Sequence, residues 1–175
     1  MKFRPVVERI VNIVTPRDAF LAAFSLHPAG VAVVTALGPE GNPVGFTATS
    51  LASFSAEPPR ATVNIAQHAS SYPALVVGAL VLVHFLAEDQ VDVARIMAGD
   101  NAHRFDGDHW STDDLGLPRL HGVRATLVTR VVSVTEFGEN ASIILEIADG
   151  STATDCAPLV YVERRFHAVG DILGG

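Results

Sequence analysis

The segment Pro43-Val44-Gly45-Phe46-Thr47-Ala48-Thr49-Ser50 gathers small hydroxyl residues at the expected end of a β-strand. Serine and threonine side chains leave neighbouring backbone N–H groups accessible, and they add hydroxyl donors without adding charge. This combination suits a phosphate group, or a planar polar ring that lies against the backbone. The segment is therefore a candidate binding site; the competing interpretation is an ordinary loop at a strand end.

The other polar residues form no recognisable metal or nucleophile pattern. The seven histidines include no His-x-His or His-x-x-x-His pair, and Cys156 is the only cysteine. Asp106-Gly107-Asp108 lies near His103 and His109 but lacks the other ligand positions of a calcium loop. No Gly-x-Gly-x-x-Gly or Walker sequence occurs, and Ser50 has no activating neighbours. We predict no metal site and no catalytic side chain.

Size and composition restrict the class of protein. The 175 residues suit a single domain, residues 1–175, and 49% hydrophobic with 18% charged content fits a large core or a buried subunit interface. The net charge of −7 argues against nucleic-acid binding, which needs a basic stripe. The longest apolar run, residues 74–83, is shorter than the ~20 residues of a membrane helix. With no signal peptide and a lone cysteine, the chain is expected to be cytoplasmic.

Hydrophobic patterning and turn residues predict a mainly β chain. Seven strands are expected, at residues 31–35, 44–49, 60–65, 79–86, 124–134, 142–148 and 159–162. A first helix should start at Thr15-Pro16, with Thr15 as its N-cap. Shorter helices are expected at residues 70–77 and 88–97, followed by a long ordered loop over residues 100–122. Because strands and helices do not alternate regularly, the pattern favours an antiparallel β-barrel with a few peripheral helices.

Five segments, in the same order, resemble the flavin reductase domain family. They are PAGVAVVT at 28–35, GFTA at 45–48 before a Pro-Pro strand, an Asn and a Ser-Ser pair within 64–73, RFDG at 104–107, and PLVY at 158–161 with RFH at 165–167. The resemblance covers most of the chain. It implies a split β-barrel of Greek-key type that binds FMN.

The resemblance also implies two groups of site residues. Its flavin-binding group is Thr47, Ala48, Thr49, Ser50, Asn64, Ile65, Ala66, Ser70, Ser71 and Phe105. Within it, Ser70 and Ser71 would bind phosphate at a helix N-terminus, and a plain helix cap is the alternative. Its nicotinamide-binding group is Asn140, Tyr161 and His167.

One position departs from the family. Members carry Gly-Asp-His in the hairpin before the penultimate long strand, where this chain reads Gly138-Glu139-Asn140. Asparagine can hydrogen-bond an amide, but it carries neither a proton nor a charge for the nicotinamide cofactor. Binding at Asn140 is therefore expected to be weak and nearly independent of pH. The alternative is that Asn140 only supports the turn.

The activity that the resemblance implies is NAD(P)H-dependent flavin reduction. A hydride would pass from NADH or NADPH to FMN, or to FAD, and reduced flavin would leave for a partner monooxygenase. A homodimer with the flavin cleft near its interface is expected. Two alternatives stay open: an FMN-binding flavoprotein with little nicotinamide turnover, which Asn140 favours, and an oxidoreductase that acts on an organic substrate through bound flavin.

Overall fold

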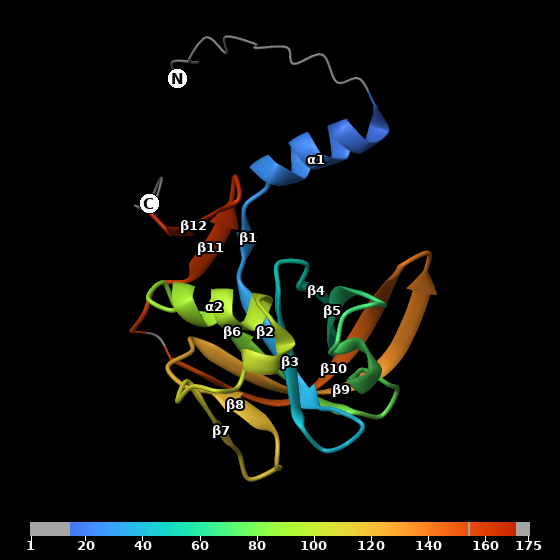
Figure 1. Ribbon diagram of the computed structural model, residues 1–175, viewed down its shortest axis with the longest axis vertical. Helices are drawn as coiled ribbons and strands as arrows, with labels where there is room; N and C mark the ends of the chain where they lie inside the picture. Colours follow the sequence, from blue (N-terminus) through green and yellow to red (C-terminus); the bar gives the residue numbers. More distant parts are fainter. Residues whose placement is uncertain (1–14, 154, 171–175) are drawn as a thin grey trace.

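One large antiparallel sheet dominates the computed structural model, which describes residues 15–153 and 155–170 (Figure 1). Its strands are β2 (Ala32–Leu37), β3 (Pro43–Ala48), β4 (Ala52–Ala56), β5 (Pro59–Ala66), β6 (Leu80–Phe85), β9 (Ala125–Phe137) and β10 (Asn140–Thr152). They pair in the order β3-β2-β6-β9-β10-β5-β4. Within the described residues, β3 and β4 end this order, so each has one edge without a partner strand.

Two smaller sheets and two helices complete the fold. The first small sheet has the order β1-β11-β12, and the second pairs β7 with β8. The bounds are β1 (Ala29–Gly30), β7 (Trp110–Thr112), β8 (Pro118–Leu120), β11 (Leu159–Val162), β12 (Arg165–Ala168), α1 (Pro16–Leu26) and α2 (Val91–Ala98). Single 3₁₀ turns occur at Tyr72–Ala74 and Asn101–His103. The predicted mainly β, antiparallel fold is confirmed.

Strand β2 is buried on both faces because it separates two hydrophobic clusters. Successive side chains of a strand point to opposite faces. Val34 packs into a cluster that includes Val63 and Ile143 of the large sheet. Its neighbour Val33 packs with Met97 of α2 on the other face. The second cluster fixes α2 against β2 and β3, and this contact positions the site described below.

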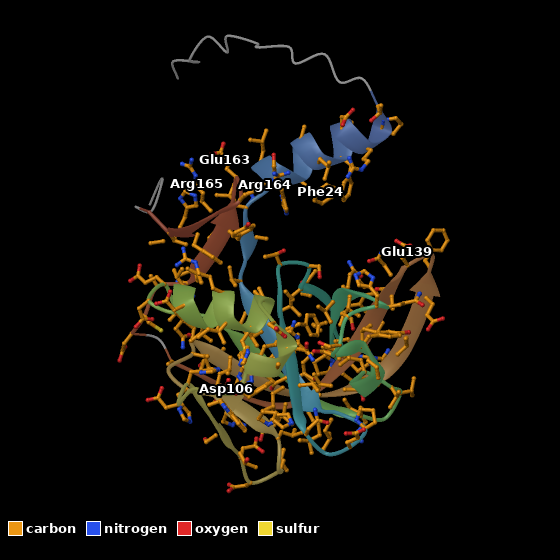
Figure 2. All side chains as sticks on the ribbon, in the orientation of Figure 1. Phe24, Asp106, Glu139, Glu163, Arg164 and Arg165 are labelled. Carbon is orange, nitrogen blue, oxygen red and sulfur yellow. The ribbon has the colours of Figure 1, made fainter. Side chains whose placement is uncertain are left out.

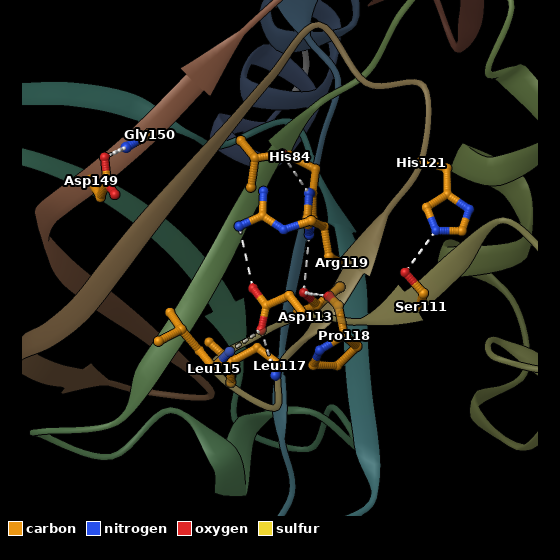
Figure 3. Close-up of polar contacts among 12 residues, drawn as sticks. His84, Ser111, Asp113, Leu115, Leu117, Pro118, Arg119, His121, Asp149 and Gly150 are labelled. Carbon is orange, nitrogen blue, oxygen red and sulfur yellow. Dashed lines mark hydrogen bonds and ion pairs between the residues drawn. The ribbon is translucent and has the colours of Figure 1, made fainter.

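A buried polar network centred on His84 joins β2, β6 and β9 (Figure 3). His84 Nε2 lies 3.1 Å from Thr35 Oγ1 and Nδ1 lies 3.2 Å from Thr126 Oγ1, while Thr35 donates to Pro118 O at 2.5 Å. Because Thr35 gives its one hydroxyl hydrogen to Pro118, Nε2–H donates to Thr35 and Nδ1 accepts from Thr126. Burial, and then the charge of Arg119, lowers the pKa of His84 from 6.5 to about 3.

Residues 100–122 are ordered by the β7–β8 hairpin, which the sequence did not predict. Asp113 Oδ1 accepts from the N–H groups of Leu115 and Leu117, both at 2.9 Å, and Oδ2 accepts from Arg119 Nη2 at 3.2 Å (Figure 3). One carboxylate therefore accepts hydrogen bonds from the loop between β7 and β8 and from Arg119 on β8.

All seven predicted strands are present, and β9 and β10 run further than residues 124–134 and 142–148. The sequence missed β1, β4, β7, β8 and β12, which have two to five residues each. Short strands have little periodicity of their own, so their pairing partners decide whether they form. β12, for example, is held by its register with β11.

The helix predictions had mixed outcomes. α1 begins as expected, since Thr15 Oγ1 accepts from the Asp18 N–H at 3.1 Å. The helix predicted at residues 70–77 is wrong: only the 3₁₀ turn at Tyr72–Ala74 forms, because the Gly78 N–H donates to Val131 O at 2.8 Å and draws the chain toward β9. The helix predicted at residues 88–97 forms as α2, but it starts at Val91 and ends at Ala98.

Helix α1 extends away from the large sheet, with one end near β11 and β12 (Figure 1). None of its residues is buried, and Phe20 and Phe24 are 57% and 62% exposed with ring centroids 4.6 Å apart. At its C-terminal end, Ser25 O accepts from the Glu163 N–H at 2.6 Å. Among the described residues, no helix is long and apolar enough to cross a membrane.

Candidate functional site

The candidate site lies along the outer edge of β3, which is the edge that faces away from β2. Gly45 O accepts from Ser71 Oγ at 2.9 Å and from Arg104 Nη1 at 2.7 Å, so it faces away from β2. Residues two apart in an antiparallel strand orient their backbone groups alike. The N–H and C=O of Thr47 therefore also face away from β2. A Cβ on Gly45 would lie 2.9 Å from the backbone oxygen of Val34 and 2.6 Å from Met97 Cε, which explains the need for glycine under α2.

At the Gly45 end of β3 lies a small polar pocket of about 90 Å³. Its lining residues are Asn42, Pro43, Val44, Gly45, Ser70, Ser71, Asn101, Arg104 and Phe105. Arg104 Nη1 lies 3.3 Å from Ser70 Oγ and 3.4 Å from Ser71 Oγ. No carboxylate lines this pocket, which we call the anion pocket.

Arg104 is fixed by carbonyl groups. Its Nε and Nη2 donate to Gly99 O at 3.1 and 2.8 Å. No ion pair of Arg104 occurs in the described part of the chain. Burial lowers the pKa of Arg104 and Asp100 opposes that shift, but a guanidinium stays charged in a protein. A half-buried cation among neutral donors is suited to a phosphate group.

The predicted hydroxyl residues divide into two groups. Three already donate to the protein: Thr47 to Ala94 O at 2.7 Å, Ser50 to Asn64 O at 3.2 Å, and Ser71 to Gly45 O at 2.9 Å. These bonds join β3 to α2, the residues after β3 to β5, and the segment before the 3₁₀ turn to β3. Ser70 and Thr49 are exposed and keep their hydroxyl hydrogens available within the described residues.

The remaining predicted flavin-binding residues differ in their exposure to solvent and in their position in the fold. Ala48 and Ile65 are buried in the core at 4% and 6% exposure, so only their backbone can reach a ligand. Asn64 is exposed, and Ala66 is half-buried at the end of β5. Phe105 lines the anion pocket and packs edge-on against Trp110 at 5.0 Å between centroids.

Two larger grooves meet at the other end of β3. The first, of about 790 Å³, lies between β3, α2 and the β11–β12 hairpin. The second, of about 610 Å³, lies between α1, the start of β4 and the same hairpin. Both are lined by Thr49, Tyr161 and Arg164. Ser50 and Asn64 line only the second groove.

The three nicotinamide candidates do not come together within one copy of the chain. Tyr161 lines both grooves, and His167 lies exposed on β12 opposite Val160. Asn140 is the exposed first residue of β10, at the far tip of the β9–β10 hairpin beside Glu139 (Figure 2). The turn itself is made by Gly138, whose φ is +59°, and Glu139.

Sequence reasoning missed the arginines. It quoted Arg104 and Arg165 only as parts of motifs, and it did not name Arg95 and Arg164; all but Arg104 line the first groove. The eleven arginines are scattered along the sequence, and only folding gathers four of them around β3. The composition could have pointed to these arginines. A chain with one lysine must bind a phosphate group through arginine side chains or neutral hydrogen-bond donors.

Comparison with known proteins shows the family to which this chain belongs. Residues 24–170 match the flavin reductase like domain model, and the chain belongs to this family. The NADH:FMN oxidoreductase of Rhodococcus erythropolis is 37% identical over 153 residues, 85% of this chain and 79% of that protein. The 4-hydroxyphenylacetate 3-monooxygenase reductase component of Pseudomonas aeruginosa is 32% identical, over 86% of this chain and 91% of that protein. The crystal structure of a flavin reductase domain protein from Arthrobacter sp. FB24 has a TM-score of 0.84 at 35% identity and covers 90% of this chain and 98% of its own.

Proposed function

We propose that this chain is an NAD(P)H-dependent flavin reductase that uses FMN, with FAD as the alternative flavin, and NADH or NADPH as hydride donor. The observation that carries the proposal is the anion pocket at the open edge of β3. FMN needs one site for a phosphate and an adjoining polar edge for its ring, and Arg104 with Thr47 offers both. The similarity to an NADH:FMN oxidoreductase over most of the chain supports this choice.

The edge of β3 has a suitable length for this ligand. At ~3.3 Å per residue, Gly45 and Thr49 are about 13 Å apart, comparable with a ribityl phosphate chain plus part of a ring system. The outward N–H and C=O of Thr47 lie between these ends and form a donor–acceptor pair. The side chain of Ala48 is in the core, so a planar ring can approach the backbone closely.

The hydride transfer from nicotinamide C4 to flavin N5 is chemistry that the two nucleotides supply when bound. The residues of this chain position them. Arg104 and Ser70 would hold the flavin phosphate, and Thr47 would orient the ring through its backbone. Catalysis then depends on holding donor and acceptor ~3–3.5 Å apart.

An NADH- and NADPH-oxidation assay with free FMN and free FAD tests the activity. We expect rapid oxidation that depends on added FMN. A protein that stays yellow through purification and oxidises neither dinucleotide would instead support the flavoprotein with little nicotinamide turnover. Oxidation only after an organic substrate is added would support the third alternative.

We also propose a homodimer. Phe20 and Phe24 give α1 an apolar face that nothing in the described chain covers, and α1 borders the second groove beside Ser50 and Asn64. A second copy packed on α1 would bury this face and close the site. The whole chain would act as one domain in the cytoplasm and supply reduced flavin to a monooxygenase, as expected from similarity to a monooxygenase reductase component.

A further inference from the structure

The loop that carries Arg104 is held by two consecutive side chains at the start of the β7–β8 hairpin. His109 Nε2 lies 2.9 Å from Arg104 O, and Trp110 Nε1 donates to Phe105 O at 2.9 Å. A carbonyl oxygen only accepts, so His109 carries a hydrogen on Nε2 and donates it to Arg104. Two neighbouring carbonyl groups of this loop are therefore each bound by the side chain five residues further on. We call His109 and Trp110 the carbonyl clamp.

Both members of the clamp are anchored in the body of the protein. Trp110 pairs with Leu120 in the β7–β8 ladder and packs against the second hydrophobic cluster, edge-on to Phe105. His109 is half-buried, and its own carbonyl accepts from the His121 N–H at 2.9 Å, which extends the ladder by one pair. The clamp therefore connects the Arg104 loop to a hairpin whose residues do not line the anion pocket.

Gly107 leaves room for the imidazole of His109 to reach back to this loop. A Cβ on Gly107 would lie 2.8 Å from His109 Nδ1, which is closer than real Cβ contacts come. The ring would have to move, and its bond to Arg104 O would move with it. The clamp thus gives a local reason for glycine at the end of the segment Arg104-Phe105-Asp106-Gly107.

The position of the Arg104 backbone decides where its guanidinium can reach. Nη1 donates to Gly45 O at 2.7 Å and lies 3.3 Å from Ser70 Oγ, while Nε and Nη2 donate to Gly99 O. An arginine side chain that rotates freely loses conformational entropy when it binds a ligand, and a guanidinium that is already fixed loses less. The clamp holds the backbone end of this side chain, and the two glycine carbonyls hold the charged end.

We propose, resting on the flavin binding proposed above, that His109 and Trp110 are positioning residues for the flavin phosphate. Neither lines the anion pocket, and both act by fixing Arg104. The competing explanation is that their hydrogen bonds stabilise only the hairpin. A positioning role predicts weaker binding of the flavin that carries a phosphate, whereas a hairpin role predicts no distinction between FMN and riboflavin.

The test compares the affinities for FMN and riboflavin, which differ only in the phosphate, by quenching of flavin fluorescence. His109→Ala removes the donor, and His109→Gln keeps an N–H close to the position of Nε2. The matched control is His121→Ala in the same hairpin. The ring nitrogens of His121 lie 2.8 Å from Ser111 Oγ (Figure 3) and 3.1 Å from Asp108 O. The control therefore removes a similar pair of ring contacts and leaves the clamp intact.

We expect His109→Ala to raise the Kd of FMN by about three- to tenfold and to keep the Kd of riboflavin within about twofold of the parent chain. His109→Gln should restore FMN binding, and His121→Ala should change neither Kd. In an Arg104→Gln background, His109→Ala should have no further effect on FMN, because the clamp then has no guanidinium to position. If His109→Ala does not fold, Trp110→Phe, which keeps an aromatic ring and loses the Nε1 donor, replaces it in the same comparison.

Several results would overturn the positioning role. One is an equal loss of affinity for FMN and riboflavin, and another is an equal loss in the His121→Ala control. Additive losses in the double variant Arg104→Gln, His109→Ala would show that His109 acts independently of the guanidinium. None of these titrations uses NADH or NADPH, so a parent chain that binds FMN but oxidises neither dinucleotide would end the reductase proposal without deciding this one.

Discussion

Arg104 is the residue on which flavin affinity should depend most strongly. Its guanidinium is fixed by Gly99 and Gly45 carbonyls and faces Ser70 and Ser71. Replacing Arg104 with glutamine removes a charge-assisted hydrogen bond to phosphate, worth ~1.5–3 kcal/mol. We expect FMN affinity to fall by roughly 10- to 100-fold, measured by quenching of FMN fluorescence.

Arg130→Gln provides the control for this variant because it removes the same charge from the exposed face of β9. Riboflavin, which lacks the phosphate, should bind the Arg104→Gln variant as well as it binds the parent chain. An equal loss for riboflavin and FMN would show that Arg104 shapes the pocket and does not contact the phosphate.

His84 should make folding stability depend on pH. Its pKa is about 3 in the folded state and 6.5 in the unfolded chain, so stability is full above pH 6.5 and is lost as the pH falls toward 3. The loss is about 1.4 kcal/mol per pH unit, or about 2 kcal/mol between pH 6.5 and 5. Urea unfolding at pH 7.5 and pH 5 measures it.

His84→Gln should remove this part of the pH dependence although it lowers stability at both pH values. The exposed His68 provides a comparison, since His68→Gln should keep the full difference between pH 7.5 and pH 5. Identical pH differences in the two variants would contradict the role of His84.

At the residue scale, the sequence selected candidate residues by type but did not reveal what each side chain contacts. The hydroxyls of Thr47, Ser50 and Ser71 were selected by type, and type does not reveal that each donates to a distant carbonyl. The partner of Thr47, for example, is Ala94 on α2, 47 residues away. These contacts depend on tertiary packing, which a local pattern does not contain.

Among the elements, the β11–β12 turn should tolerate glycine better than its native residue. Glu163 has a φ of 50°, where a side chain costs roughly 1–2 kcal/mol and glycine costs little. Glu163→Gly should therefore raise the unfolding free energy by about 1 kcal/mol in urea titration.

Glu139→Gly is the matched control for the turn, because Glu139 occupies the two-residue loop of the β9–β10 hairpin without a positive φ. It should lower stability by about 0.5–1 kcal/mol. Stabilisation by both substitutions, or by neither, would argue against strain at Glu163.

The long strands that are rich in β-branched residues were the most predictable elements. β9 and β10, with 13 residues each, carry their own alternation and pair directly through the Gly138-Glu139 turn. The Tyr72–Ala74 turn could not be predicted in the same way. Its serines and Pro73 are typical of a helix start, but the hydrogen bond of Gly78 to Val131 ends the helix, and that partner is 53 residues further along the chain.

For the whole molecule, α1 provides the test of assembly. Phe20→Ser together with Phe24→Ser should convert the proposed dimer to a monomer in light scattering at micromolar concentration, because burial of each phenylalanine contributes roughly 1.5–3 kcal/mol. Leu115→Ser, in the β7–β8 loop at the opposite end of the molecule, should leave the mass unchanged (Figure 1). A parent chain that is already monomeric would refute the dimer.

The low charged fraction did not decide between a large core and a buried subunit interface, and it could not locate an interface. A content of 18% charged residues is equally compatible with a large core and with an interface. In the proposed homodimer the exposed phenylalanines of α1 would be that interface, since a helix with no buried residue does not contribute to the core of its own chain.

The outward edge of β3 has a consequence for the protein without its ligand. A strand with unpaired N–H and C=O groups is a template for adding another strand from a neighbouring molecule. β3 has no lysine, aspartate or glutamate to discourage such pairing. Pro43 lacks an N–H and Gly45 O is bonded to Ser71 and Arg104, so Thr47 is the open part of this edge. Flavin lying on this edge would act as a cover, so ligand-free protein should aggregate faster on warming than protein reloaded with FMN, as turbidity would record. Cofactor supply would then govern solubility as well as turnover.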